Sequence, residues 1–320
     1  MIVSLEALPR NREALIAAVL TAAEFGSISL INIPDLLRFS LRSWEACGIL
    51  REDLPDAAGT TLPEGGRVCR ASRVPPETVS PAIFCPPNPE AASAASAPDN
   101  RDFHAPGDTK IHKRDRPLEL MPHIRAVDFD MAVPFPHTEY FRSRGINRAL
   151  VIAGDPPKLK TGPGKTESPD GQTRPAYPTE TVPFIRKLKT EMPELEVYAA
   201  FDPYRSNIRY ELDYLKEKED AGAAGFMSQP FFDLRLLEIY AEYLEGKNIF
   251  WGVSPALSES NRKYWESRNR AIFPRNFRPD MYWNVDFGRR VLSFCETHHF
   301  NFYLMPIKIE LAPYLQGLFA

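Results

Sequence analysis

The sequence predicts a (β/α)8 barrel that is interrupted by one long insertion. Short apolar strands alternate with amphipathic helices along most of the 320 residues, and eight such units can be recognised. Parallel strands joined by helices cross over right-handed, so eight units in this length are expected to close into a barrel. An open doubly wound sheet is the alternative, but no Gly-x-Gly-x-x-Gly turn follows the first strand.

The first two units precede the insertion. Strands are expected at 2–6 and 27–33, and helices at 11–25 and 36–47. Gly26 closes the first helix, and Pro34 stops the second strand. From about residue 49 to 118 the chain is rich in proline, alanine and serine and has no sustained period. This composition predicts an irregular, flexible excursion from a single catalytic barrel that spans residues 1–320.

The remaining units follow one another closely. Strands are expected at 122–128, 148–155, 196–201, 249–253 and 301–305, with one more ending at Gln229, and helices at 135–144, 179–190, 207–221, 234–244 and 283–297. The proline-rich segment 156–178 is expected to form a rim of the barrel mouth.

Composition excludes several classes of protein. A net charge of −3 and a pI near 6.1 give no basic field for nucleic acid. The four cysteines are not paired at close spacing, which predicts neither a metal site nor a disulfide framework. The sequence starts without a basic leader, and no apolar run approaches the roughly 18 residues of a membrane helix. We therefore expect a cytoplasmic enzyme that contacts neither membrane nor nucleic acid.

In a barrel the chemistry lies at the carboxyl ends of the strands. A carboxyl partly enclosed at Glu6 would have its pKa raised toward the range of a proton donor, although a structural salt bridge is the alternative. Gly154 has no side chain, so a ligand can approach the backbone closely just before Asp155, which is a candidate binding residue. The alternative is that Asp155 caps a helix or a turn. Gln229, followed by an aromatic pair, suits the floor under a flat heterocycle; the alternative is a capped strand end.

Four segments resemble the methylenetetrahydrofolate reductase family in their order and spacing. They are Val-Ser-Leu-Glu6-Ala-Leu-Pro, Met-Pro-His123, Ala-Gly-Asp155-Pro-Pro, and Asp-Ala-Gly-Ala through Gln229-Pro-Phe-Phe-Asp. The resemblance covers nearly the whole chain outside the insertion. It implies a (β/α)8 enzyme of one-carbon metabolism and methionine biosynthesis that reduces 5,10-methylenetetrahydrofolate to 5-methyltetrahydrofolate, with hydride from NADH or NADPH passed through FAD.

The resemblance also implies roles for particular residues. Glu6 matches the family's general acid, Asp155 and Gln229 match the positions that read the pterin, and Lys308 is expected to contact the substrate. For the flavin, Phe201 matches an aromatic shelf, Lys218 a phosphate-binding lysine and Glu211 a ribose-binding acid, while His123, Gly154 and Asp155 complete the cofactor positions.

Departures from the family pattern fall mostly on positions that face the flavin. Two aromatic residues expected after Glu6 are replaced by Ala7 and Leu8, and an arginine expected before Gly154 is replaced by Ala153. A weakly held flavin and direct hydride transfer from nicotinamide to the folate are therefore both open. An alternative function is a folate-binding or methyl-transfer component that acts with a partner protein. A homo-oligomer is also possible.

Overall fold

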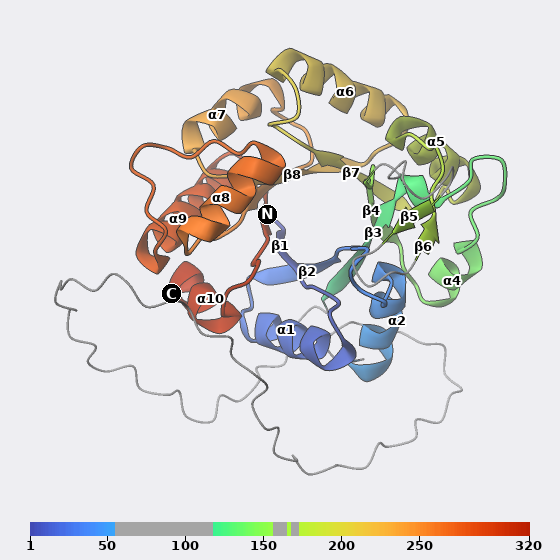
Figure 1. Cartoon of the computed structure of the whole chain (residues 1–320), viewed down its shortest axis with the longest axis horizontal. Coiled ribbons are helices and arrows are strands. Elements are labelled where there is room, and N and C mark those ends of the chain that lie inside the picture. Colours follow the sequence, from blue (N-terminus) through green and yellow to red (C-terminus); the bar gives the residue numbers. More distant parts are fainter. Residues whose placement is uncertain (55–117, 156–164, 168–172) are drawn as a thin grey trace, which may run out of the picture. The chain divides into compact units, whose positions relative to one another are not determined.

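The protein is a closed barrel of parallel strands surrounded by helices (Figure 1). The computed structural model describes residues 1–54, 118–155, 165–167 and 173–320. The strand order around the barrel is β1-β10-β9-β8-β7-β4-β3-β2. This confirms the predicted fold class, with the insertion between the second helix and the third strand of the barrel. The insertion begins later than the expected residue 49, because α2 continues to Asp53; the predicted irregularity of the rest concerns residues outside the described ranges.

The described elements agree with most expected ranges to within a few residues. The barrel strands are β1 (Val3–Glu6), β2 (Ile28–Ile33), β3 (Glu119–Arg125), β4 (Arg148–Ile152), β7 (Glu196–Phe201), β8 (Gly225–Phe231), β9 (Ile249–Val253) and β10 (Asn301–Leu304). The helices are α1 (Arg12–Glu24), α2 (Ser43–Asp53), α4 (Thr138–Ser143), α5 (Thr181–Glu191), α6 (Ile208–Asp220), α7 (Leu234–Tyr243), α8 (Glu259–Asn269), α9 (Met281–Thr297) and α10 (Leu311–Phe319), with a 3-10 turn η1 (Ala126–Asp128). None of the described helices is long and apolar enough to cross a membrane.

The helix expected at 36–47 was placed too early, because α2 begins only at Ser43. The backbone N–H of Arg42 donates to Glu45 Oε2 at 3.1 Å, which satisfies the amide of the N-cap residue at the start of the helix. The Arg42 guanidinium also donates to Asp35 Oδ2 and Asp128 Oδ2, each at 2.7 Å. These ion pairs hold the segment before α2 as a loop at the carboxyl end of β2.

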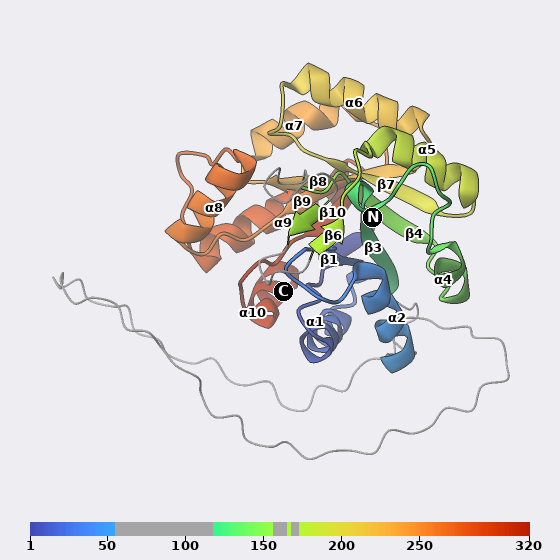
Figure 2. The ribbon, with the colours of Figure 1, turned by 45° about the vertical axis from the view of Figure 1, so that its right-hand side comes forward.

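Two helices and a hairpin were not predicted. Helix α8 buries only Trp265, so its sequence has no apolar stripe to indicate a helix. Helix α10 contains Pro313 and Gly317, which suggest a break, but Pro313 lies in the first turn, where proline is tolerated. It lies beside α1 in both views (Figures 1 and 2). Within the proline-rich segment, β5 (Lys165–Glu167) pairs antiparallel with β6 (Thr173–Pro175).

The barrel interior is apolar at its centre and polar toward the carboxyl ends of β2 and β3. Side chains that fill its centre form a cluster separate from the core between strands and helices: Leu30, Met121, Leu150, Tyr198, Met227, Phe250, Tyr303 and Met305. Because side chains alternate along a strand, residues two positions after these also point inward. Asn32 and His123 follow Leu30 and Met121 in this way, and both are buried. The carboxyl end of the barrel therefore carries buried polar side chains, and chemistry can occur there.

Candidate functional site

A carboxyl group lies at the carboxyl end of β1. Glu6 is the last residue of that strand and pairs in register with Asn32 of β2. The hydroxyl of Tyr303 on β10 donates a hydrogen bond to Glu6 Oε2. Desolvation by burial raises the pKa of Glu6 to about 7, although this hydrogen bond and the charge of Arg38 act in the opposite direction. Glu6 can therefore hold a proton near neutral pH and release it.

Tyr303 keeps its own proton and acts only as the hydrogen-bond donor to Glu6. Its phenol is buried, and desolvation together with the neighbouring Glu6 raises its pKa well above the usual value. It therefore stays protonated and remains the donor of the hydrogen bond. The transferable proton of Glu6 is accordingly assigned to Oε1, the carboxyl oxygen that Tyr303 does not occupy.

The inner faces of β2 and β3 form a polar wall next to Glu6. Asn32 Nδ2 donates to Ser4 Oγ. Within the described part of the chain, Asn32 Oδ1 and His123 Nε2 are buried without hydrogen-bond partners. Burial lowers the pKa of His123 to about 3, so its imidazole is neutral at physiological pH. This wall can bind a ligand through uncharged polar atoms of Asn32 and His123.

The exit of β4 brings backbone close to the same wall. Gly154 has φ +85°, and a Cβ at this position would lie 2.6 Å from Val127 Cγ2 and 3.0 Å from Arg125 Nε. Only glycine fits this conformation and this spacing without strain. Asp155 follows directly and is exposed. Its carboxylate is therefore accessible to a ligand at the rim of the barrel.

Gln229 lies on the far side of the barrel mouth, on β8. The pairing of β8 with β9 shifts register between Met227 and Pro230, so Gln229 lies within an irregularity of the strand. Its side-chain Oε1 accepts a hydrogen bond of 3.1 Å from Asn269 Nδ2. Asn269 thus holds the amide in place from one side.

Three residues expected to bind the flavin are enclosed elsewhere. Phe201 has no exposed surface and packs between strands and helices, with its ring centroid 5.0 Å from Tyr240 and 6.0 Å from Trp251. Glu211, also fully buried, accepts from Arg205 Nη2 at 3.0 Å. These contacts support the exit of β7 and do not present either side chain to the barrel mouth.

Lys218 is the third of these enclosed residues. Its Nζ donates to the Ala200 carbonyl at 2.6 Å and lies 4.0 Å from the centroid of the Tyr214 ring. Desolvation by burial lowers its pKa to about 8, while Glu211 acts in the opposite direction. Its ammonium group is therefore already engaged inside the protein.

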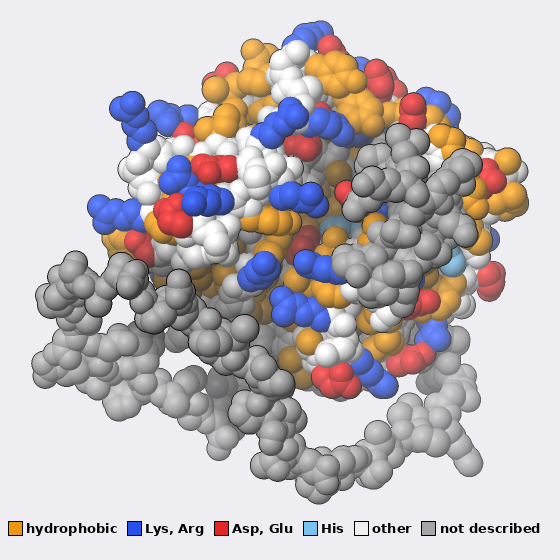
Figure 3. Space-filling view, in the orientation of Figure 1, with side chains coloured by type: hydrophobic (Ala, Val, Ile, Leu, Met, Phe, Trp, Pro, Cys, Tyr) orange, Lys and Arg blue, Asp and Glu red, His pale blue; other side chains and the backbone are white. Residues whose placement is uncertain are grey.

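The structure thus brings together part of the expected site. Glu6, His123, Gly154, Asp155 and Gln229 all lie at the carboxyl ends of barrel strands, and exposed Lys308 follows β10 with a left-handed φ of 57°. No group of His, Cys, Asp or Glu suited to a metal ion occurs among the described residues. Figure 3, in the orientation of Figure 1, shows a hollow at the centre of the molecule. Acidic and histidine atoms lie deep inside the hollow, and Lys or Arg side chains lie at its edge.

Sequence reasoning missed Tyr303, Arg38 and Arg125. The alternation that places His123 inside the barrel also places Arg125 there, so period two along β3 was a usable signal. The partnership of Tyr303 with Glu6 had no local signal, because the two residues are 297 positions apart. Arg38 lies in the loop that was expected to be helical.

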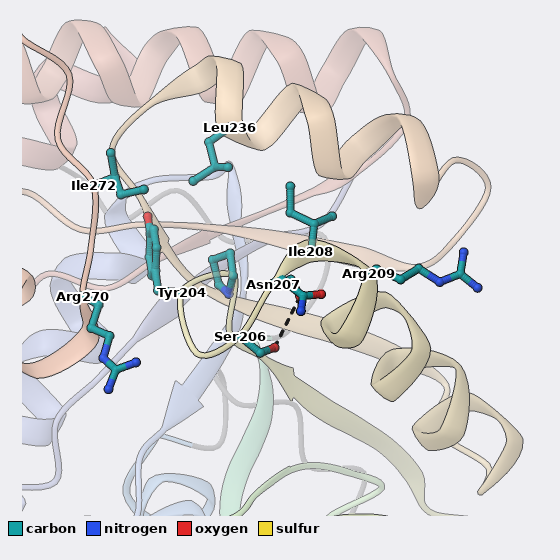
Figure 4. A pocket seen from close by; sticks show the side chains of 9 residues that line it. Tyr204, Ser206, Asn207, Ile208, Arg209, Leu236, Arg270 and Ile272 are labelled. Atoms are coloured by element: carbon teal, nitrogen blue, oxygen red, sulfur yellow. Dashed lines mark hydrogen bonds between the residues drawn. The ribbon is translucent and has the colours of Figure 1, made fainter.

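A separate groove of about 610 Å³ lies beside the β7–α6 loop (Figure 4). Apolar side chains on its walls include Tyr204, Ile208, Leu236 and Ile272. Arg209 points away from the other labelled side chains, and Ser206 Oγ donates to the Asn207 carbonyl at 3.4 Å. The groove contains none of the residues expected to act on the substrate.

One protein family matches part of the chain. The family model described as methylenetetrahydrofolate reductase matches residues 102–256. Over this segment, a little under half of the chain, the sequence is similar to the methylenetetrahydrofolate reductase family. The match includes His123, Asp155 and Gln229, whereas Glu6 and Lys308 lie outside it.

Two solved structures are similar to this chain at low sequence identity. A 2,3-dimethylmalate lyase of the PEP mutase/isocitrate lyase superfamily is 8% identical, with 99% of this chain and 78% of that chain covered and a TM-score of 0.48. Dihydropteroate synthase from Thermus thermophilus is 10% identical, with 99% of this chain and 90% of that chain covered and a TM-score of 0.42. No curated protein matches the sequence.

Members of the methylenetetrahydrofolate reductase family typically use FAD, and the described residues fit one part of this cofactor better than the other. The polar wall offers His123 Nε2 and the terminal nitrogens of Arg125, which are buried, lack partners among the described residues and suit acceptor atoms of the ring system. The residues expected at the diphosphate and ribose, Lys218 and Glu211, are bound to other protein groups. The described residues therefore fit the flavin ring system, whereas the residues expected to contact its diphosphate and ribose have other partners.

Proposed function

We propose that this protein reduces 5,10-methylenetetrahydrofolate to 5-methyltetrahydrofolate with hydride from NADH or NADPH. The observation that carries the proposal is the Glu6–Tyr303 pair, a carboxyl group with a pKa of about 7 at the carboxyl end of a barrel strand. The family match supports the substrate class.

Glu6 supplies the proton that the reaction requires. In the substrate, one methylene carbon bridges two nitrogens of the folate. Protonation of the outer nitrogen by Glu6 Oε1 breaks its bond to the methylene carbon and leaves an iminium on the pterin nitrogen. Hydride then adds to the iminium carbon and forms the methyl group. Glu6 is left as a carboxylate and regains its proton from solvent.

Asp155 and Gln229 are proposed to orient the pterin. The pterin edge carries amino and ring N–H donors beside a carbonyl acceptor, and an exposed carboxylate together with an amide can complement this pattern. They lie two strands apart around the barrel mouth, at the exit of β4 and on β8, with β7 between them. We infer that Lys308, whose side chain is exposed, binds a carboxylate of the folate tail through its ammonium group.

The hydride reaches the iminium either through FAD or directly from nicotinamide. When bound, FAD would accept hydride from NAD(P)H and pass it on. His123, Gly154 and Arg125 would then lie against the ring. Lys218 and Glu211 would have to exchange their present partners to reach the diphosphate and ribose. Their engagement favours a loosely held flavin or direct transfer.

The test combines spectroscopy with an assay. A visible spectrum of the purified protein before and after addition of FAD reports flavin binding. Oxidation of NADH and of NADPH is then followed with and without methylenetetrahydrofolate. We expect folate-dependent oxidation; a requirement for added FAD would indicate the flavin route. Folate binding without oxidation of either nucleotide would contradict the proposal and support a folate-binding or methyl-transfer component, the second candidate.

A further inference from the structure

A buried guanidinium group without a hydrogen-bonding partner on its terminal nitrogens lies at the end of β3. Arg125 is 2% exposed and follows Met121 and His123 on the inward face of the strand. Its Nη1 and Nη2 have no hydrogen-bond partner among the described residues. The carboxylate oxygen Asp128 Oδ1 is 3.8 Å from Nη2, which is too long for a hydrogen bond.

Other cations that are at least partly buried in the described part of the chain have close partners. Arg148 pairs with Glu196 at 2.6 Å and also contacts Glu119. Lys187 pairs with Glu191 at 2.6 Å. Arg125 differs from them because Asp128, the carboxylate beside it, is held by Arg42 at 2.7 Å. A buried cation left in this way is unfavourable unless another group completes its hydrogen bonds.

Two further atoms on the same part of the barrel lack partners within the described ranges. His123 Nε2 is two residues before Arg125 on β3, and Asn32 Oδ1 is on the neighbouring strand β2. Gly154 brings the β4 exit against the Arg125 side chain, since a Cβ there would lie 3.0 Å from Arg125 Nε. Unsatisfied polar atoms thus lie toward the carboxyl ends of β2 and β3, and the exit of β4 lies against the Arg125 side chain.

We propose that Arg125 binds a planar ligand group that presents two acceptor atoms to the guanidinium fork, with His123 on the same strand and Asn32 on the neighbouring strand facing the same barrel mouth. This inference rests on the proposed function and deepens it by naming a contact at the same barrel mouth. A guanidinium matches two neighbouring acceptors with parallel N–H bonds, as in a carboxylate, a phosphate or the carbonyl edge of a heterocycle. Both FAD and the folate carry such groups.

The test compares arginine variants at the two ends of the barrel. Arg125→Met keeps most of the side-chain length and removes the charge, and Arg125→Lys keeps the charge but lacks the fork. Arg148→Met is the matched control, because Arg148 begins β4 at the opposite end of the barrel. Titrations with FAD and, separately, with 5-methyltetrahydrofolate report which ligand supplies the acceptors. Melting temperatures without ligand report the structural contribution.

We expect Arg125→Met to weaken the binding of FAD or of 5-methyltetrahydrofolate, or of both, by about tenfold or more. Arg125→Lys should have a smaller effect on the same affinity. Arg148→Met should leave both affinities unchanged. Without ligand, Arg125→Met should melt within a few degrees of the unmodified protein, because Arg125 makes only the long 3.8 Å ion pair with Asp128, whereas Arg148→Met loses short ion pairs and should melt clearly lower.

Two results would overturn this assignment alone. One is that Arg125→Met binds both FAD and the folate as tightly as the unmodified protein does. The other is a fall in melting temperature of Arg125→Met as large as that of Arg148→Met, which would make Arg125 a structural ion-pair residue. If the unmodified protein bound neither FAD nor 5-methyltetrahydrofolate, the proposed function and this assignment would fail together.

Discussion

At the scale of single residues, the Glu6 carboxyl decides whether this barrel can protonate its substrate. Glu6→Gln preserves the size of the side chain and can still accept from Tyr303, but it cannot donate a proton at neutral pH. We expect folate reduction to fall by about two to four orders of magnitude while folate binding survives. Steady-state NAD(P)H oxidation and folate titration measure the two effects.

The control for this substitution is Glu196→Gln, at the opposite end of the barrel, which should retain activity. If a flavin is bound, its reduction by NAD(P)H involves no ring opening and should proceed normally in Glu6→Gln. A normal rate of folate reduction in Glu6→Gln would instead make Glu6 structural.

The raised pKa of Glu6 also predicts how stability depends on pH. Its ordinary value is 4.5 and its value in the folded protein is about 7, so the folded state binds this proton more tightly than the unfolded state does. The resulting stabilisation is complete below pH 4.5 and is lost as the pH rises through 7. At a pH of about 8.5 the buried carboxylate should cost on the order of 1–3 kcal/mol.

Thermal unfolding at two pH values tests this dependence. Glu6→Gln should be more stable than the unmodified protein at a pH of about 8.5, and the advantage should disappear near the ordinary pKa of 4.5. His123 titrates in both proteins, and its lowered pKa makes both lose stability as the pH falls below 6.5, so its effect cancels in the difference. An advantage of Glu6→Gln that is the same at both pH values would show that Glu6 is not desolvated as described.

Asp155 and Gln229 are predicted to bind the pterin without supporting the fold. Asp155→Asn and Gln229→Ala should each weaken folate binding by about tenfold, because each removes a hydrogen bond to the ligand. Their melting temperatures should stay within a few degrees, since one side chain is exposed and the other is only partly buried. Asp213→Asn on the exposed face of α6 is the control. Unchanged folate affinity in both variants would end the pterin assignment.

At the scale of elements, the exit of β4 depends on one glycine. In Gly154→Ala, the alanine would have to adopt a left-handed φ of +85°, and its Cβ would lie only 2.6 Å from Val127 Cγ2. We expect a loss of about 2–4 kcal/mol in the free energy of unfolding, the sum of backbone strain and overpacking. Ligand affinity should fall as well, because the shift displaces Asp155 and Arg125.

Gly246 provides the matched control for Gly154. It has φ +75°, but nothing lies within 4 Å of the position of its Cβ. Gly246→Ala should therefore cost only the backbone strain, about 1 kcal/mol, and leave ligand binding unchanged. Chemical denaturation of the two variants separates strain from crowding. An equal loss of unfolding free energy in both variants would show that the β4 exit accommodates the extra Cβ without a further cost.

At the scale of the whole molecule, Asn301 ties together the strands that close the barrel. Its Oδ1 accepts from the backbone N–H of Ile2 at 2.7 Å, and its Nδ2 donates to Asn248 Oδ1 at 2.9 Å. Asn301→Ala should cost about 1–3 kcal/mol in the free energy of unfolding, because both bonds are lost and one lies partly buried. The KM and kcat of the folded protein should not change, since Asn301 lies at the amino end of β10.

Asn301→Asp refines this test. An aspartate can still accept from Ile2, but it cannot donate to Asn248, so it should recover part of the lost stability. Denaturation of the three proteins measures the difference. A cost for Asn301→Asp that equals or exceeds the cost for Asn301→Ala would show that the bond to Ile2 does not stabilise the closure of the barrel.

The sequence by itself determined the barrel and the line of residues at its mouth. Alternating apolar periods identify the eight strands of the barrel, because period two and period 3.6 are local properties of the chain. Once the strands are placed, parallel pairing requires their carboxyl ends to share one face. This is why Glu6, His123, Asp155 and Gln229 could be selected before their positions in space were known. Helix α8 escaped detection because it buries only Trp265 and has no local period.

The tertiary structure alone decided which side chains are available to a ligand. The Glu6–Tyr303 bond joins residues 297 positions apart, and the unsatisfied nitrogens of Arg125 can be recognised only from the described residues around them. Lys218 and Glu211 match family positions in the sequence, yet close contacts with Ala200 and Arg205 engage both of them. Burial and hydrogen bonding depend on contacts between distant segments, so the spacing of residues along the chain does not determine them.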